Sequence, residues 1–439
     1  MESLAEGGYQ VGEYARWMLC DDPLQDTIKT LDEEVAVAET LRRLKLPNAT
    51  IAEGAFRAGD LLTRADVIVK EEKVLKLYEV KSKSWDRNAA FWTIGNPPRL
   101  SAHWETYLLD VAFQKYVIEK ACPELDVKAH LVLLNKEKVA SVDGLNQMFP
   151  IREWKGRRGV DPRIASKEEL GRDLLEYINV DRDIDLVRKV GFDLPQGGRG
   201  SFAELIKQSL EIFQGNQPFY CGVGAKCKTC QYRLPSDSRE AGKLIADGKK
   251  SGLDECWAGV VGRKYDPAQA KVIELWNYRQ ADERINDGKY YLRDLVQQDL
   301  GAGKRADRQW LQVDKVRRGD ASPWIDRNGL RAEMTQWTYP LHFIDFETSR
   351  MALPVYCGGH PYMQVAFLFS HHTVARDGQI RHAGQWIEAR AGVFPSFQFV
   401  RELKLQLEAD QGTIFRYAAH ENSVLRDIRD QLESSSEPD

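Results

Sequence analysis

The stretch that decides the fold of the N-terminal part of the chain is IAEGAFRAGDLLTRADVIVKEEKVLKLYEVKSKS, residues 51–84. Two of its segments, residues 67–69 and 74–80, are rich in Val, Ile and Leu, and a charged turn at residues 70–73 separates them. Apolar, β-branched segments on either side of a short polar turn are typical of a β-hairpin. We therefore expect two antiparallel strands joined by this turn.

Three charged side chains fall near one end of the hairpin. Asp66 directly precedes the first apolar segment, and the second ends with Glu79-Val80-Lys81. Because side chains alternate between the two faces of a strand, Glu79 and Lys81 should share a face, and strand pairing should bring Asp66 close to them. Two carboxylates beside an amine suit a divalent cation, Mg²⁺ or Mn²⁺, and the water that it activates. The alternative is a hairpin whose charges are only solvated.

Length, charge and apolar runs limit the classes of protein to consider. The chain has 439 residues and a formal net charge of −4. The length predicts two or three domains, and the charge means that nucleic-acid binding has to come from local basic patches. No apolar run approaches about 18 residues, and the N-terminus has no signal-peptide core. We therefore expect a cytoplasmic protein with no membrane contact.

Apolar spacing predicts the elements around the hairpin. Helices are expected at residues 33–44 and Glu105–Ala121, followed by a strand at residues 127–134. The order helix, three strands, helix, strand indicates an α/β sandwich. Further amphipathic helices are expected at residues 166–190, 202–213 and 268–300.

Cysteines form the second notable group. The chain has seven, and four of them lie close together as Cys221-x5-Cys227-x2-Cys230 followed by Cys256. A CxxC knuckle places two thiolates on one ion or cluster, and four ligands complete a zinc site or a [4Fe–4S] cluster. The alternative is a set of ordinary buried thiols, which is the interpretation for the two cysteines at positions 122 and 357.

A third group of acids lies in the C-terminal part. Residues 339–349, YPLHFIDFETS, read as a strand on which Asp345 and Glu347 share a face. Strands at residues 363–371, near Trp386 and at 412–417 are expected to follow, with helices at Ser396–Leu407 and residues 421–432. Glu421 begins the last helix.

The spacing of Asp66, Glu79 and Lys81 resembles that of PD-(D/E)XK nucleases, in particular the RecB-like branch. The resemblance implies a restriction-endonuclease-like core in which Asp66 and Glu79 bind Mg²⁺ or Mn²⁺. Lys81 would orient or deprotonate the attacking water and stabilise charge on the phosphorane. Gln114 and Tyr116 look like the Gln-x-x-Tyr motif of that branch with one residue fewer between them.

Two further residues near this motif have open roles. Gln114 would contact the nucleic-acid backbone or hold the active-site helix. Glu53, on the preceding strand, either supports the metal or forms a structural salt bridge.

The cysteines also resemble a pattern of this nuclease branch. Iron–sulfur members carry one Cys before the nuclease motifs and three after them, and Cys227, Cys230 and Cys256 look like those three. Either Cys20 or Cys221 would supply the fourth ligand, and Cys221 is favoured because it adjoins the knuckle. The resemblance implies a [4Fe–4S] cluster, with Zn²⁺ as the alternative.

The C-terminal part resembles the DEDD-type exonucleases of the RNase H-like fold. Asp345 and Glu347 match the first motif and Glu421 the second. The third motif, an Asp on a later helix, would lie beyond Asp439. The resemblance therefore implies the fold, with a truncated domain and one acid fewer than the pattern.

The three parts together look like a bacterial family that joins a RecB-like module to a C-terminal domain of unknown function, number 2779 of its series. The domains expected are residues 1–138, 139–330 and 331–439. The function expected is a metal-dependent deoxyribonuclease of repair, recombination or defence, acting on DNA rather than RNA, with a helicase or another repair or defence protein as partner. The alternatives are a non-catalytic nucleic-acid-binding scaffold and a DEDD-type exonuclease that uses the C-terminal domain.

Overall fold

The structure is a computed structural model, and it describes residues 2–95, 99–154, 157–216, 222–235, 238–390 and 392–437. The chain divides into two compact units. The first combines Met1–Gly191 with Ala332–Asp439, and the second is Phe192–Arg331. Each unit is described by itself.

The first unit is built on a five-stranded mixed sheet with the order β1-β2-β3-β4-β7. Its strands are β1 (Asn48–Ala58), β2 (Leu61–Glu71), β3 (Val74–Trp85), β4 (Asp126–Asn135) and β7 (Leu175–Asn179). Strands β1, β2 and β3 form an antiparallel meander, as the hairpin pattern predicts. Strand β4 is parallel to β3, so the chain between them must cross over, and it does so through helix α4 (Glu105–Ala121).

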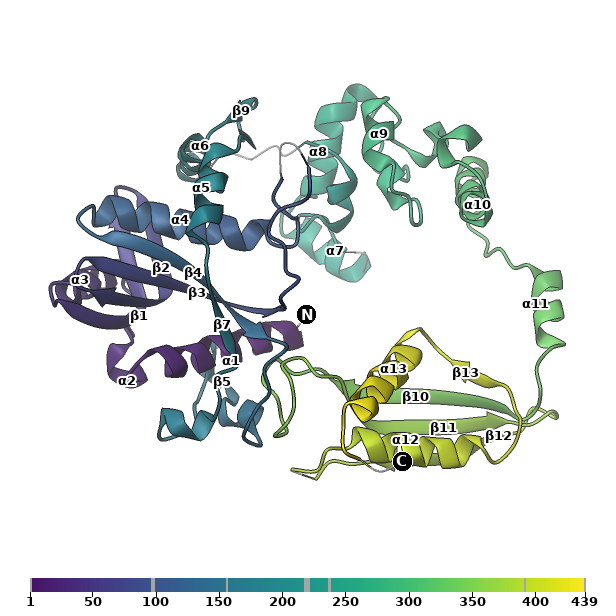
Figure 1. The fold of residues 1–439 in the computed structure, drawn as a ribbon. Helices are drawn as coiled ribbons and strands as arrows, with labels where there is room; N and C mark the ends of the chain where they lie inside the picture. Colours follow the sequence, from purple (N-terminus) through teal and green to yellow (C-terminus); the bar gives the residue numbers. More distant parts are fainter. Residues whose placement is uncertain are drawn as a thin grey trace. The chain divides into compact units, whose positions relative to one another are not determined.

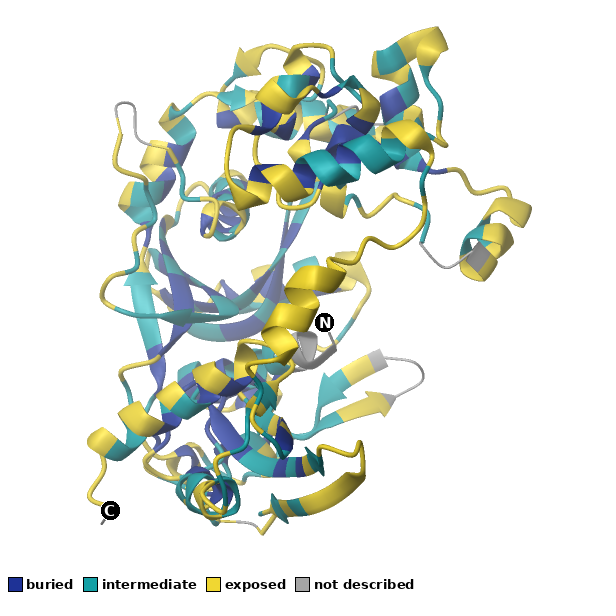
Figure 2. Ribbon diagram, turned by 90° about the vertical axis from the view of Figure 1, so that its right-hand side faces the viewer, coloured by how far each residue is buried: buried dark blue, intermediate teal, exposed yellow. Residues whose placement is uncertain are grey.

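Helices cover both faces of this sheet. Figure 1 shows α4 along one face, and α1 (Glu2–Leu19) packs on the other face. There Tyr14 of α1 and Val132 of β4 belong to one buried cluster. The short α2 (Pro23–Asp26) and the longer α3 (Glu33–Arg43) lead into β1. The predicted order of helix, three strands, helix and strand is therefore observed, and Figure 2 shows buried residues gathered on these strands.

The segment after β4 departs from expectation. A single helix is expected at residues 166–190, but the chain forms a 3₁₀ turn, then β7, and only then α5 (Asp181–Lys189). The left-handed backbone of Gly171 ends the turn. Strand β7 then pairs with β4, and this pairing buries the apolar Leu174 and Leu175 at the edge of the sheet. A small hairpin, β5 (Ile151–Trp154) and β6 (Arg157–Val160), precedes them.

The C-terminal part of the first unit is a second sheet, with the order β12-β11-β10-β13. Its strands are β10 (Leu341–Ser349), β11 (Val365–Val374), β12 (Ile380–Ile387) and β13 (Ile414–Arg416). The first three are antiparallel, and β13 is parallel to β10. Helices α12 (Ser396–Leu407) and α13 (His420–Glu433) pack on the face that carries Ile344 and Phe346. The predicted strands and helices of this part are confirmed.

The loop between β10 and β11 ties the two sheets together within the first unit. Ala352 and Leu353 are buried in the same cluster as Tyr14. The backbone of this loop is also hydrogen-bonded to the segment after β4, for example from Gly144 N–H to Val355 O at 2.7 Å. The loop is therefore part of the N-terminal core.

The second unit is mainly helical. Its helices are α6 (Phe202–Gln214), α7 (Ser238–Ala246), α8 (Gly252–Val261), α9 (Ala281–Asn286) and α10 (Lys304–Arg318), and α11 (Arg327–Met334) begins within it. The unit starts with a small hairpin of two short strands, β8 (Phe192–Asp193) and β9 (Arg199–Gly200). Trp257 is fully buried at its centre. The long helix expected at residues 268–300 is wrong, because short 3₁₀ turns surround α9 and residues with left-handed backbone, Asn277 and Gly288, interrupt any continuous helix.

In the part of the chain that the structure describes, no helix is both long and apolar enough to cross a membrane.

Candidate active site

The candidate site lies where β2 and β3 separate. Their last paired residues are Val67 and Tyr78. Beyond this pair the carboxylate of Asp66 takes the place of a strand partner, since its Oδ2 accepts the N–H of Val80 at 2.7 Å. The structure thus places Asp66 beside Glu79-Val80-Lys81, as the sequence predicts.

Strand β3 and helix α4 meet through successive side-chain pairs, which we call the β3–α4 ladder. Gln114 Nε2 donates to Glu79 Oε2 at 2.7 Å. Lys81 Nζ donates to Asp110 Oδ2 at 2.6 Å and to Glu79 Oε1 at 2.6 Å. Further along, the Lys83 ammonium lies 5.3 Å from the centre of the Tyr107 ring.

The two periodicities explain why this ladder forms. Residues 107, 110 and 114 share a helix face, and residues 79, 81 and 83 are alternate positions of a strand. From residue 107 to residue 114 the helix rises about 10.5 Å, and from residue 79 to residue 83 a strand extends about 13 Å. Because these lengths are similar, all three side-chain pairs, which we call the rungs of the ladder, can stay in contact. Asp110 is the residue that sequence reasoning missed. Its signal was its position four residues before Gln114, on the same helix face.

Burial and mutual repulsion shape the electrostatics of the two carboxylates. Glu79 is buried, and burial first and the charge of Asp66 second raise its pKa above the usual range. Burial also raises the pKa of Asp66, an effect that the hydrogen bond from Val80 N–H opposes. For Lys81, in contrast to the two carboxylates, the charged form is favoured. Burial disfavours its charge, but Glu79 and Asp110 outweigh burial and raise its pKa.

A further acid and a basic side chain border the site from β1 and α1. Glu53 lies opposite Asp66 in register, between the pairs Ala52–Val67 and Gly54–Ala65. Its backbone has a left-handed φ of 58°. Its carboxylate pairs with Arg16 at 3.0 Å and with Arg64 at 3.4 Å. Of the two roles expected for Glu53, the structure therefore contains the salt bridge.

The chemistry of these residues fits a hard divalent cation. Two buried or half-buried carboxylates that repel each other gain from a positive ion between them. The buried Gln114 Oε1 also has no hydrogen-bond partner among the described residues. Nowhere in the described ranges do three His, Cys, Asp or Glu side chains form a group able to hold a metal. A cation held by Asp66 and Glu79 would take its remaining oxygens from water and substrate, as Mg²⁺ commonly does.

We predict that the stability of the metal-free protein falls as the pH rises above the ordinary carboxylate range. Asp66 and Glu79 keep their protons to higher pH in the folded chain than in the unfolded one. The folded state therefore binds more protons in this interval, and the free energy of unfolding decreases with pH. Melting temperatures in EDTA should drop between about pH 5 and about pH 8, and Mg²⁺ or Mn²⁺ should reverse part of the drop.

The matched control is the double variant Asp66→Asn, Glu79→Gln, which removes both titrating groups. It should have a flatter pH dependence than the native chain and no stabilisation by the metal. An equal metal effect in both proteins would contradict the assignment of these carboxylates.

The C-terminal acids lie in the second half of β10 and at the start of α13. Asp345 and Glu347 alternate with the buried Ile344 and Phe346, so they share the exposed face of β10, as predicted. Glu421 is 4% exposed, and its Oε2 has no hydrogen-bond partner among the described residues.

The cysteine motif is only partly visible. Cys227 is buried in a 3₁₀ turn and its Sγ accepts the N–H of Gly224 at 3.4 Å, while Cys230 and Cys256 are half-buried. Cys221 lies outside the described residues. The metal site therefore stays a prediction. Cys20, the other proposed ligand, is buried in the first unit, where burial raises the pKa of its thiol.

The two remaining cysteines, at positions 122 and 357, differ in exposure. Cys122 is buried, as expected. The interpretation of Cys357 as a buried thiol is wrong, because it lies exposed in the loop between β10 and β11.

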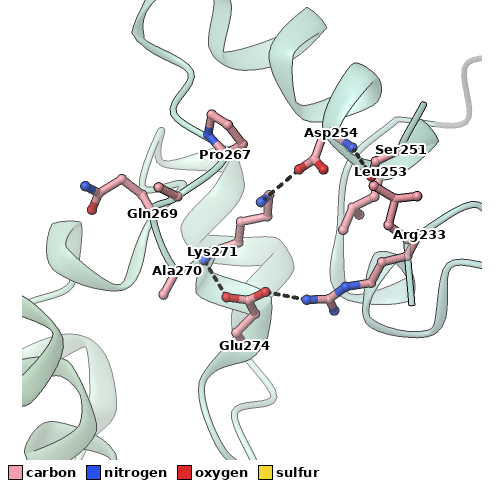
Figure 3. Close-up of a pocket in the computed structure, with 11 residues that line it drawn as sticks. Arg233, Ser251, Leu253, Asp254, Pro267, Gln269, Ala270, Lys271 and Glu274 are labelled. Atoms are coloured by element: carbon pink, nitrogen blue, oxygen red, sulfur yellow. Dashed lines mark hydrogen bonds and ion pairs between the residues drawn. The ribbon is translucent and has the colours of Figure 1, made fainter. Parts of the chain in front are cut away.

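A polar cavity of about 250 Å³ in the second unit joins the two cysteine-bearing segments (Figure 3). Arg233, which follows the knuckle, pairs with Glu274 at 2.7 Å. Asp254, two residues before Cys256 on α8, pairs with the buried Lys271 at 3.1 Å. Lys271 N–H donates to Glu274 Oε2 at 3.1 Å and closes the chain of contacts. These ion pairs hold the segment after Cys230 near α8.

Comparison with known proteins identifies one segment of the chain. Residues 342–438 match the family model described as a domain of unknown function (DUF2779). The match covers β10 to α13 and confirms the C-terminal part of the predicted family. No curated protein and no solved structure matches the chain.

Proposed function

We propose that this protein is a metal-dependent nuclease that hydrolyses phosphodiester bonds in DNA, with its active site at the end of β2 and β3. The observation that carries the proposal is the convergence of Asp66, Glu79 and Lys81, held by Val80 N–H and by the β3–α4 ladder. The element order and the sheet β1-β2-β3-β4 also agree with a PD-(D/E)XK core. Repair, recombination or defence, in the cytoplasm, is the setting we infer.

In the proposed reaction, Asp66 and Glu79 would hold a divalent cation, which would stabilise the charge of the phosphorane and lower the pKa of the attacking water. Water forms a bond to phosphorus and loses a proton to solvent, while the bond from phosphorus to one ester oxygen breaks and that oxygen takes up a proton from solvent to leave as an alcohol. Glu79 stays fixed because Gln114 and Lys81 each hold one of its oxygens.

The contacts of Lys81 favour one of its two expected roles. Glu79 and Asp110 each lie 2.6 Å from its ammonium and stabilise the charged form. A charged ammonium donates hydrogen bonds and attracts phosphate oxygen. Lys81 therefore serves to orient the water and to stabilise the developing negative charge rather than to remove a proton. Asp110 positions Lys81, and Gln114 holds Glu79.

The proposal is tested with end-labelled single- and double-stranded DNA and RNA, each incubated with Mg²⁺, Mn²⁺ or EDTA. We expect cleavage of DNA with either metal and none with EDTA. Binding to all these nucleic acids without cleavage under any condition would favour the rival function, a non-catalytic scaffold.

Two observations support a second candidate function, a DEDD-type exonuclease in the C-terminal part. The strand order β12-β11-β10-β13 agrees with an RNase H-like fold, and the buried Glu421 has an oxygen without a partner among the described residues. Two metals about 4 Å apart need several bridging carboxylates. Asp345 and Glu347 lie on the exposed face of β10, whereas α13, which carries Glu421, packs on the opposite face. We infer that this part positions the DNA strand.

For the second unit we propose a [4Fe–4S] cluster or, alternatively, a zinc ion on Cys227, Cys230, Cys256 and Cys221. Three of these thiols lie on the segments that the polar cavity ties together. A helicase or another repair or defence protein is the partner we propose for the full enzyme.

A further inference from the structure

The third rung of the β3–α4 ladder differs from the other two in its charge balance. Glu79 and Lys81 are matched by an amide and a carboxylate of α4, but Lys83 faces aromatic rings. Its ammonium lies 4.3 Å from the centre of the Trp104 ring and 5.3 Å from that of Tyr107. Among the described residues no carboxylate is within ion-pair distance of Lys83.

The ammonium of Lys83 is nevertheless held in place. It donates one hydrogen bond, to His103 O at 2.7 Å, which leaves two donors for another group. Trp104 is 6% exposed and provides a fixed surface under the amine. Burial lowers the pKa of Lys83, as expected for an ammonium that has no carboxylate partner.

The backbone between the two lysines is fixed as well. Tyr362, in the loop between β10 and β11, donates its hydroxyl hydrogen to Ser82 O. The backbone of Tyr362 is itself left-handed, with φ of 61°, and its N–H is bonded to Met351 O at 2.8 Å. A residue held in such a conformation indicates that the surroundings determine its position. The carbonyl of Ser82, which lies between Lys81 and Lys83, is therefore anchored by this loop.

We propose that Lys83 is a binding site for the phosphate next to the one that Lys81 contacts, so that β3 holds two successive phosphates of one nucleic-acid strand. This inference rests on the proposed function. Lys81 and Lys83 are two residues apart on β3, in the stretch where its pairing with β4 shifts register. Alternate residues of a regular strand lie about 6.6 Å apart, which is close to the separation of neighbouring phosphates along an extended strand. The aromatic rings place the amine without neutralising it.

The test measures binding of a fluorescently labelled single-stranded DNA oligonucleotide in EDTA, where no cleavage occurs. Lys83→Met keeps the aliphatic stem over the rings and removes only the charge. Loss of one phosphate contact should lower the slope of log affinity against log salt by about 0.7 and weaken binding several-fold at low salt. Lys83→Arg should keep both values near those of the native chain.

Lys76→Met is the matched control, because Lys76 lies on the same strand and is paired with Glu71 at 2.9 Å. Equal slopes for Lys83→Met and Lys76→Met, with unchanged melting temperatures, would overturn the phosphate site. A reduced slope for Lys83→Met in a protein that cleaves nothing would keep the phosphate site and reject the nuclease. If the native protein cleaves DNA but Lys83→Met leaves the salt slope unchanged, the nuclease is kept and the phosphate site is rejected.

Discussion

Replacing Asp66 by Asn should reduce metal-dependent DNA cleavage by at least about 10³-fold, or about 4 kcal/mol of transition-state stabilisation. The amide keeps an oxygen that can accept the N–H of Val80, so the end of β2 should stay in place. What it loses is the negative charge that would hold the proposed cation, and this charge would matter most when the phosphorane forms. DNA affinity in EDTA should change little, because phosphate contacts of the lysines are intact.

The melting temperature of the variant distinguishes a loss of cleavage from a loss of folded protein. Because burial raises the pKa of Asp66, the neutral Asn should leave the melting temperature unchanged or raise it above neutral pH. Asp60→Asn, at the exposed turn between β1 and β2, is the control for a neutral substitution on the same hairpin. Asp345→Ala is the second comparison. If Asp345→Ala silences the enzyme while Asp66→Asn leaves it active, the active site is in the C-terminal part.

Local patterns predicted the elements well where the apolar period was uninterrupted. Helix α12 begins and ends at the predicted residues, and β2 and β3 pair around the predicted turn. Glu79 and Lys81 share a face because the strand period holds there. These features depend on short-range geometry, which a sequence contains.

The features that were not predicted depend on how distant elements meet. Asp110 joins the site only because α4 crosses β3 at a distance that matches the ladder. Tyr362 reaches Ser82 across 280 positions of sequence. The apolar positions at residues 174–178 are compatible with a helix or a strand, and this segment is a strand because it pairs with β4. No local period contains this information.

Replacing Cys230 by Ser should abolish binding of the proposed metal and unfold the second unit. Cys227 and its neighbours pack against Trp257, so loss of the metal would open the core of that unit. Metal binding to a thiolate site contributes about 10–16 kcal/mol of apparent free energy, while a whole domain is stable by only about 5–15 kcal/mol. Without its metal, the unit should therefore lack a stable fold, and the full-length variant should lose one unfolding transition.

The measurement is metal analysis and calorimetry of the anaerobically purified full chain. An iron–sulfur cluster should absorb broadly near roughly 400 nm, and the variant should be colourless. Cys357→Ser is the matched control, since Cys357 is exposed and lies in the first unit. Stoichiometric zinc with no iron would replace the cluster by a zinc site with the same ligands. A native protein without either metal, whose second unit melts as Cys230→Ser does, would show that apolar packing around Trp257 alone holds this unit together.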